Sequence, residues 1–264
     1  MIGDIVGQPG CRAMFAALQG LLKETRADLV IANGENASGG LGITPVAAEG
    51  MFKTGVDIIT SGNHIWQHRE IIPVLERDKR ILRPENYPVG VPGSGHTLIV
   101  KKDIPVAIIN LQGRTNMYSI RCPFKVGDSL LRQLGKKAKV VVVDFHAELS
   151  EEKEALALYL DGRISALVGT HTHVQSADET ILPGGTAYIT DMGMTGPVEG
   201  VIGMKRDISI KRSLMQIPYK MEVEESAAAV MGVLLTVSVS SGKALAIERI
   251  RRDLPDLDAS KHGS

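Results

Sequence analysis

Seven side chains of metal-binding type stand at the ends of five short apolar runs in this chain. Buried parallel strands read as continuous Val, Ile and Leu runs, and open α/β sheets bind ligands beyond the carboxyl ends of such strands. One repeated position in the fold would therefore gather these side chains into an active site. The set is Asp4, Glu35, Asn36, Asn63, His146, His171 and His173.

The sequence Gly169-Thr170-His171-Thr172-His173 indicates metal chemistry. Histidines two positions apart share one face of a strand, whereas a helix would place them on nearly opposite sides. The full set forms a nitrogen and oxygen shell without thiolate, which suits iron, manganese, zinc or cobalt better than calcium. Because a catalytic ion keeps an open position, seven ligands are too many for one ion, and two ions are the better count.

Formal charges at this site indicate the substrate. Asp4 and Glu35 contribute two negative charges, a shared hydroxide a third and two divalent ions four positive charges, which leaves one positive charge in excess. Two-metal hydrolytic sites lower the pKa of a shared water and clamp the oxygens of an in-line displacement at phosphorus. A phosphoester is therefore the best-fitting substrate.

The order of these motifs resembles the calcineurin-like metallophosphoesterases. It runs Gly3-Asp4, Gly34-Glu35-Asn36, Gly62-Asn63-His64, then His146 alone after a strand, then the two-histidine motif. More narrowly, the chain resembles the YmdB-like bacterial branch from Gly3 to about Gly203. The matching stretches include residues 33–40, 83–88, 110–114, 144–148 and 184–191.

This resemblance implies a ligand arrangement. Glu35 would bridge two ions of the di-iron or di-manganese type, with zinc and cobalt left open, and His64 would be the proton donor to the leaving oxygen. The remaining ligands would divide into Asp4, Asn36 and His173 on one ion and Asn63, His146 and His171 on the other. The superfamily motif Asp-x-His lacks its histidine here, which puts weight on Asn36. Relatives usually carry more apolar residues before Asp4, so we expect a shortened first strand and a less rigid Asp4.

The resemblance also implies fold and function. It predicts an α/β sandwich of two mixed β-sheets flanked by helices, whereas strand alternation alone also permits a three-layer sandwich. The implied activity opens 2′,3′-cyclic nucleotides at the 2′ oxygen to leave 3′-monophosphates. A phosphomonoesterase, such as a nucleotidase or protein phosphatase, and a metal-binding regulator with weak turnover remain alternatives. Candidate pocket walls are residues 83–87, 112–117 and 192–196.

Several polar residues have two interpretations. Taken alone, His146 could be a structural histidine. Asp144 and Asp191 could each orient a ligating imidazole or cap the end of a strand. Arg114 could pair with a phosphate or form an ordinary salt bridge. Four residues lie outside the matching positions and are interpreted as neighbouring, surface or tail residues, namely Trp66, His68, His96 and His262.

Composition limits the remaining possibilities. The 264 residues carry 30 basic and 30 acidic side chains, which argues against binding long nucleic acid through bulk charge. No apolar stretch reaches membrane-spanning length, and no basic region precedes a hydrophobic core at the N-terminus. Cys11 and Cys122 have no zinc-site spacing, so a reducing cytoplasm is the default compartment. We expect a single domain over residues 1–255 and a disordered tail over 256–264.

Local signals predict most of the elements. Helices are expected from Pro9 to Ala27, from Thr44 to Gly55, from Gln67 to Arg77 and from Ser150 to about Asp161. Strand pairs are expected at residues 97–100 with 106–111, and at 227–239 with 244–250. The Gly-rich segment from Asp191 to Gly203 is a candidate for a lid or a contact between copies in a homo-oligomer.

Overall fold

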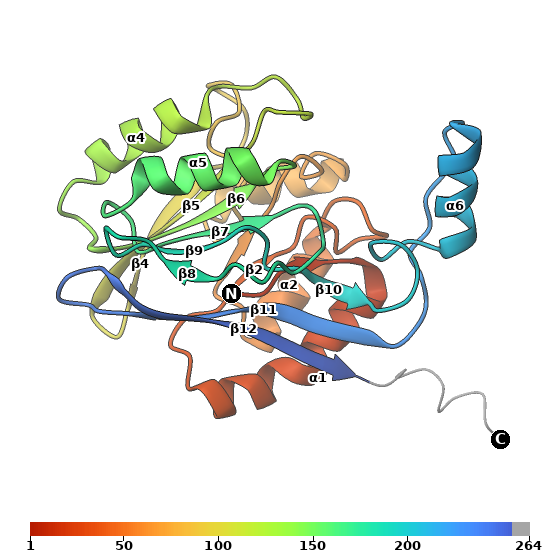
Figure 1. Ribbon diagram of the computed structural model, residues 1–264, viewed down its shortest axis with the longest axis horizontal. Coiled ribbons are helices and arrows are strands. Elements are labelled where there is room, and N and C mark those ends of the chain that lie inside the picture. Colours follow the sequence, from red (N-terminus) through yellow and green to blue (C-terminus); the bar gives the residue numbers. More distant parts are fainter. Residues whose placement is uncertain (255–264) are drawn as a thin grey trace.

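The structure, a computed structural model, describes residues 1–254 and contains two mixed β-sheets packed against each other (Figure 1). The larger sheet has the strand order β4-β5-β6-β7-β9-β8. Its central strands are parallel, and the two edge strands are antiparallel to their neighbours. The bounds are β4 His96–Lys101, β5 Ile104–Gln112, β6 Val140–His146, β7 Ala166–Thr170, β8 Thr180–Ile181 and β9 Ala187–Ile189.

The second sheet consists of two parts that isolated bridges join. One part has the order β1-β10-β11-β12, and the other pairs β2 with β3 in parallel. Parallel bridges from Ile2 to Ala32 and from Val6 to Asn36 connect them. The bounds are β1 Asp4–Ile5, β2 Ile31–Asn33, β3 Ile58–Thr60, β10 Met194–Pro197, β11 Ala228–Val237 and β12 Ala244–Leu254.

Apolar side chains from both sheets form the central layer of the core. Ile31 and Ile58 of the second sheet pack in one buried cluster with Ile108 and Val142 of the larger sheet. Burial of each such side chain contributes about 1.5–3 kcal/mol. This packing confirms the expected sandwich of two mixed sheets and excludes the simple three-layer alternative.

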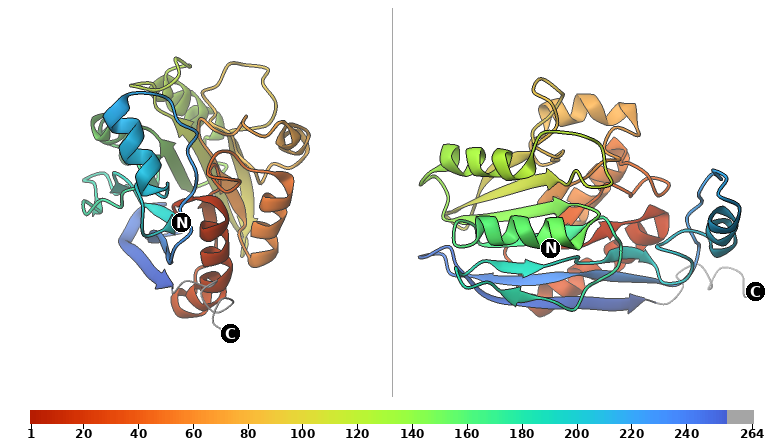
Figure 2. Two further views of the ribbon diagram at one scale, coloured as in Figure 1. Left: turned by 90° about the vertical axis from the view of Figure 1, so that its right-hand side faces the viewer. Right: turned by 45° about the horizontal axis from the view of Figure 1, so that its top comes forward.

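Helices cover the outer faces of the sandwich, and one helix stands apart (Figure 2). Helices α1 and α2, with α3, pack on the second sheet, whereas α4 and α5 pack on the larger sheet. Helix α6 projects from the body beyond the end of β10. The bounds are α1 Gly7–Thr25, α2 Pro45–Thr54, α3 Ile72–Arg77, α4 Pro123–Leu134, α5 Ser150–Leu160 and α6 Arg206–Met215.

Local chemistry explains where α2 begins and ends. Thr44 Oγ1 accepts a hydrogen bond from the Ala47 amide at 3.3 Å, and Pro45 occupies the first turn. Gly55 ends the helix with φ 116°, a left-handed conformation that favours glycine. The predicted boundaries at Thr44 and Gly55 are therefore confirmed.

Two regions differ from the sequence prediction. The segment from Gln67 becomes helical only at Arg69, as a 3-10 turn Arg69–Ile71 that leads into α3, because Pro73 is tolerated only in a first helical turn. The segment from Asp191 to Gly203 is not purely a loop, since it contributes β10 to the sheet beside β1. The paired strands β4 with β5 and β11 with β12 are confirmed.

The structure also bears on the expected short first strand, on membrane-spanning segments and on the C-terminal tail. β1 is only two residues long, yet Asp4 is fully buried. Within residues 1–254, no helix is both long and apolar enough to cross a membrane. The expected tail over 256–264, with His262, lies outside the described residues.

Candidate metal centre

The structure brings the seven predicted ligands and His64 into one network of contacts at the carboxyl ends of the strands. Asp4 lies in β1 and His146 ends β6, while the other members follow β2, β3 and β7. Parallel pairing of β5, β6 and β7 aligns these ends, as the sequence predicted. Which of these residues bind metal stays a prediction.

His146 Nε2 is the meeting point of one group. It lies 2.9 Å from Glu35 Oε1, 3.2 Å from Asn63 Oδ1 and 3.0 Å from His171 Nδ1. One ring nitrogen carries at most one proton, so hydrogen bonding cannot satisfy all three neighbours at once. Within the described residues, Glu35, His146 and His171 place ligand atoms within 4.8 Å of one another. A cation would fit this convergence.

Asn36 is the centre of a second group. Its Nδ2 lies 3.1 Å from His173 Nε2 and 3.3 Å from Glu35 Oε1, and its Oδ1 lies 2.9 Å from His64 Nδ1. Turning this amide by 180° would aim its oxygen at His173 and Glu35 and let its NH₂ group donate to His64. Glu35 therefore touches both groups, which is the position a bridging carboxylate needs.

The carboxylate of Asp4 shows whether the site fits a cation, because one of its oxygens lacks a partner in the described part of the chain. Its Oδ2 accepts a hydrogen bond from the His171 amide at 3.1 Å. Its Oδ1 is buried and has no hydrogen-bond partner within residues 1–254, and His146 Nδ1 lies 3.9 Å from it. A buried carboxylate oxygen without a partner is costly. The donor set thus fits a divalent ion of the type that the fold implies.

Electrostatics at the site favour charged Glu35 and a cationic neighbour. Burial opposes its charge, but His146 and His64 hold the pKa of Glu35 well below its usual range. Burial would lower the pKa of His146, yet the carboxylates of Glu35, Asp4 and Asp144 raise it to about 9. The proton that His146 holds in the metal-free protein occupies the place that a metal ion would take.

Burial is the main cause of the pKa shifts of Asp4 and His171, two further predicted ligands. Desolvation raises the pKa of Asp4 to about 6, against the attraction of His173 and His146. Desolvation, followed by the charge of His146, lowers the pKa of His171 to about 3. His171 is therefore neutral at pH 7, which is the form that binds metals.

Asp144 orients His146 through a threonine. Thr170 Oγ1 donates to Asp144 Oδ1 at 2.7 Å and lies 3.0 Å from His146 Nδ1. Asn33 Nδ2 and the Thr60 hydroxyl donate to the other oxygen of Asp144. Of the two interpretations of Asp144, the structure favours the one in which it orients an imidazole, that of His146.

Asp191 and Lys153 fix the loop that carries the last two histidines. Asp191 Oδ2 accepts from the Thr172 amide at 3.1 Å, from its hydroxyl at 2.8 Å and from Lys153 Nζ at 2.9 Å. Lys153 and Asp191 are both buried. The clamp holds Thr172 between His171 and His173, which have φ of 98° and 67°. Such left-handed backbone is unfavourable without support, so this buried pair has a positioning role.

Sequence reasoning missed Lys153 and Glu148. Lys153, Leu156, Ala157 and Leu160 form the buried stripe of α5, and a lysine on such a stripe was the available signal. Glu148 Oε2 lies 3.0 Å from His171 Nε2. No spacing rule marks that contact, because Glu148 lies in the turn before α5.

The structure shows the contacts of Arg83 and Arg114, which belong to the candidate pocket walls, and of two histidines outside the matching motifs. Arg83 is buried, and its guanidinium donates to the carbonyl oxygens of Pro84, Pro92 and Gly93, so it supports the fold. The backbone N–H of Arg114 donates to Glu152 on α5. His68 contacts the Ser38 carbonyl oxygen and His96 pairs with Glu85, both outside the network of ligands.

Comparison with known proteins places this architecture in a family. The model of the YmdB-like protein family matches residues 1–250. A Bacillus subtilis (strain 168) protein named 2′,3′-cyclic-nucleotide 2′-phosphodiesterase is 43% identical over 249 residues, which cover 94% of each chain. The crystal structure of a novel phosphatase from Mycoplasma pneumoniae is 34% identical with a TM-score of 0.91, covering 99% of this chain and 95% of that one.

A more distant structure shares the fold alone. The NAD nucleotidase of Haemophilus influenzae is 16% identical with a TM-score of 0.59, covering 92% of this chain and 49% of that one. The sandwich is thus of the metallophosphoesterase type, as expected. With the family model matching nearly the whole described chain, this protein belongs to the YmdB-like family.

Proposed function

We propose that this chain is a metal-dependent phosphodiesterase that opens 2′,3′-cyclic nucleotides at the 2′ oxygen and leaves 3′-monophosphates. The observation that carries the proposal is the convergence of Glu35, Asn63 and His171 on His146 Nε2 at the carboxyl ends of the strands. The activity in the name of the related Bacillus subtilis protein supports the choice of substrate.

Two divalent ions fit the donor set, with iron or manganese as our first choice and zinc or cobalt as alternatives. We assign Glu35 as the bridge, with Asp4, Asn36 and His173 on one side. Asn63, His146 and His171 would hold the other ion. Such ions, when bound, activate a water and neutralise charge on the phosphoryl oxygens.

His64 is the residue we assign to protonate the leaving oxygen. Its side chain is 31% exposed, so it can reach a substrate, and its Nδ1 faces Asn36. If Asn36 binds metal through its oxygen, its NH₂ group donates to His64 Nδ1. The ring proton then lies on Nε2, where it can pass to the 2′ oxygen as the bond from phosphorus to that oxygen breaks.

The protein's own groups also fix the acid in place. The backbone N–H of His64 donates to Glu35 Oε2 at 3.2 Å, so the proposed acid is tied to the proposed bridge.

We further infer that the protein acts in the cytoplasm on a small phosphoester, since Cys11 and Cys122 are free thiols.

Product analysis tests this function. Metal-loaded protein is incubated with 2′,3′-cyclic AMP, 3′,5′-cyclic AMP and nucleoside monophosphates, while elemental analysis counts the bound metal. We expect the 2′,3′-cyclic substrate to be converted to the 3′-monophosphate, and Asn63→Ala to abolish this turnover. His64→Ala should keep metal and lose turnover.

Two results would favour the alternatives. Faster hydrolysis of monoesters than of diesters would indicate a phosphatase, the activity by which the Mycoplasma pneumoniae relative is named. Two bound metals without turnover of any ester would indicate a metal-binding regulator.

A further inference from the structure

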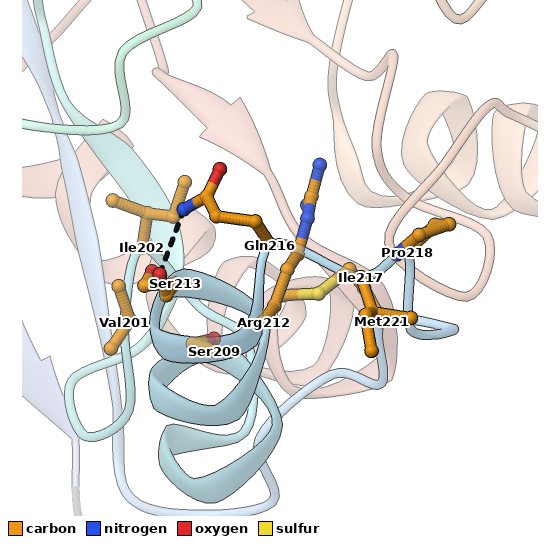
Figure 3. A pocket seen from close by; sticks show the side chains of 9 residues that line it. All are labelled: Val201, Ile202, Ser209, Arg212, Ser213, Gln216, Ile217, Pro218 and Met221. Atoms are coloured by element: carbon orange, nitrogen blue, oxygen red, sulfur yellow. Dashed lines mark hydrogen bonds between the residues drawn. The ribbon is translucent and has the colours of Figure 1, made fainter.

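A cavity of about 450 Å³ lies between α6 and the segments on either side of it (Figure 3). Its size is within the range of pockets that hold small molecules. Apolar side chains supply most of its wall, and polar groups project from α6. The lining consists of Val201, Ile202, Ser209, Arg212, Ser213, Gln216, Ile217, Pro218 and Met221.

The cavity adjoins the candidate metal centre. His173 Nδ1 lies 2.9 Å from the carbonyl oxygen of Ile202, so one wall residue of the cavity holds a predicted metal ligand. Helix α6 stands beyond the carboxyl end of β10 (Figures 1 and 2). Strand β1, which carries Asp4, runs parallel to β10, so its carboxyl end lies at the same end of the sheet. A substrate with its phosphate at the metal centre therefore has the cavity as a neighbour.

Three side chains that line the cavity have polar atoms without a hydrogen-bond partner within the described chain. Arg212 is exposed, and its guanidinium makes no hydrogen bond or ion pair within residues 1–254. Ser209 is only 8% exposed, yet its hydroxyl has no partner in the same part of the chain. Gln216 Nε2 donates to the Ser213 carbonyl oxygen at 2.7 Å, which leaves its Oε1 available. These groups are suited to a ligand with a planar face and polar edges.

We propose that this cavity binds the nucleobase of the substrate, with the Arg212 guanidinium stacked on the base. This inference rests on the proposed function and names the part of the site that recognises the nucleoside. Guanidinium planes stack on bases, and Ile202 and Ile217 offer apolar contact to the ring. Figure 3 shows Arg212 and Gln216 extending from the same side of α6, with Ile202 beside Gln216. Gln216 and Ser209 would then contact polar base edges.

The test compares two substrates that differ only in the base. One is 2′,3′-cyclic AMP, and the other is 1-O-methyl ribose 2,3-cyclic phosphate, which has the reacting ring without a base. Arg212→Gln should raise KM for the nucleotide about tenfold, as expected for loss of one stacking contact, and leave kcat unchanged. The base-free substrate should respond equally to wild type and variant.

The control is Lys211→Gln on the same helix. Lys211 also carries a positive charge, but its ammonium lies 4.9 Å from the Tyr219 ring centroid, and Lys211 does not line the cavity. We expect this variant to match wild type on both substrates. A KM rise with Lys211→Gln equal to that of Arg212→Gln would show bulk electrostatics and overturn the proposal.

Other outcomes separate this inference from the proposed function. If wild type turns over the base-free substrate but Arg212→Gln affects both substrates equally, the cavity proposal fails and the proposed function stands. A change in sedimentation of Arg212→Gln with no KM change would show a contact between copies and also overturn it. If wild type turns over neither ester, the proposed function fails, and adenosine titrated into wild type and Arg212→Gln decides the cavity, with tighter binding by wild type expected.

Discussion

The segment that carries His171 and His173 and the cavity under α6 meet at the hydrogen bond from His173 to Ile202, but their polar groups are paired very differently. On the histidine side, buried Asp144 accepts hydrogen bonds from three side chains, and Asp191 is paired with Lys153. On the α6 side, the Ser209 hydroxyl has no partner within the described chain. The contrast suggests that one region is fixed before ligand arrives, while the other gains partners from the ligand.

The largest effect on the candidate metal centre should come from a side chain that fills the space beside His146. A Cβ atom at Gly62 would lie 2.1 Å from His146 Cδ2 and 2.4 Å from Glu35 Oε2. We expect Gly62→Ala to abolish metal binding and turnover and to lower the free energy of unfolding by about 1–3 kcal/mol. Elemental analysis and denaturant unfolding measure the two effects.

Gly20→Ala is the matched control for this change. Gly20 lies in α1 with nothing within 4 Å of the added methyl group. It should keep full metal content and raise the free energy of unfolding by about 0.5–1 kcal/mol. Normal metal content in Gly62→Ala would show that the residues around His146 can move to accept the methyl group. It would contradict the claim that this region is fixed before ligand binds.

Removing Lys153 should have the next largest effect on metal binding. Lys153→Met leaves Asp191 buried without its cation, which costs about 3–5 kcal/mol, and loosens the clamp on Thr172. We expect a lower midpoint in urea and reduced metal occupancy. The same substitution at Lys205, which pairs with Glu222 at the exposed start of α6, should alter neither. Equal effects at both positions would contradict the claim that the two regions are held differently.

Substitution of Thr170, which links Asp144 to His146, tests whether this link affects metal affinity. Thr170→Val keeps the shape and removes the hydroxyl that links the two groups. Loss of a hydrogen bond that orients a metal-binding histidine typically lowers metal affinity about 10–100-fold. We expect a decrease of about that size for Thr170→Val. Thr170→Ser should restore affinity, measured by competition with a chelator. If the Thr170→Val variant binds metal as tightly as the Thr170→Ser variant, metal binding at His146 does not depend on this hydroxyl.

Titration of metal into metal-free protein should be proton-linked. The pKa of His146, at about 9, lies above its ordinary value of 6.5, so its proton stabilises the metal-free fold below pH 6.5, and this stability is lost as the pH rises through 9. Metal must displace that proton, so affinity should rise about tenfold per pH unit until His146 titrates. Below about pH 6, protonation of Asp4 should weaken binding further. Affinity that is constant from pH 6 to 9 would mean that His146 is not a ligand.

The sequence predicted which side chains would lie together better than it predicted the residues that hold them in place. Asp4, Glu35 and His146 follow apolar runs, and parallel pairing brings such positions together whatever the helices do. The role of Asp144 depended on tertiary contacts, since Asn33 and Thr60 come from the other sheet. Helix α6 escaped prediction because it covers no sheet, so its sequence needs no apolar stripe toward a core.

The smallest expected effect compares two buried hydroxyls. Ser209→Ala removes a hydroxyl that has no partner within residues 1–254, so the free energy of unfolding should stay the same or rise by up to about 1 kcal/mol. Alanine also favours the helix. Thr170→Val removes the hydroxyl partner of Asp144 Oδ1 and of His146 Nδ1, both buried, and should cost about 1–3 kcal/mol. Paired urea titrations of both variants measure the difference. If Ser209→Ala is as costly as Thr170→Val, the Ser209 hydroxyl is already satisfied in the free protein and is not a group that the cavity keeps for a base.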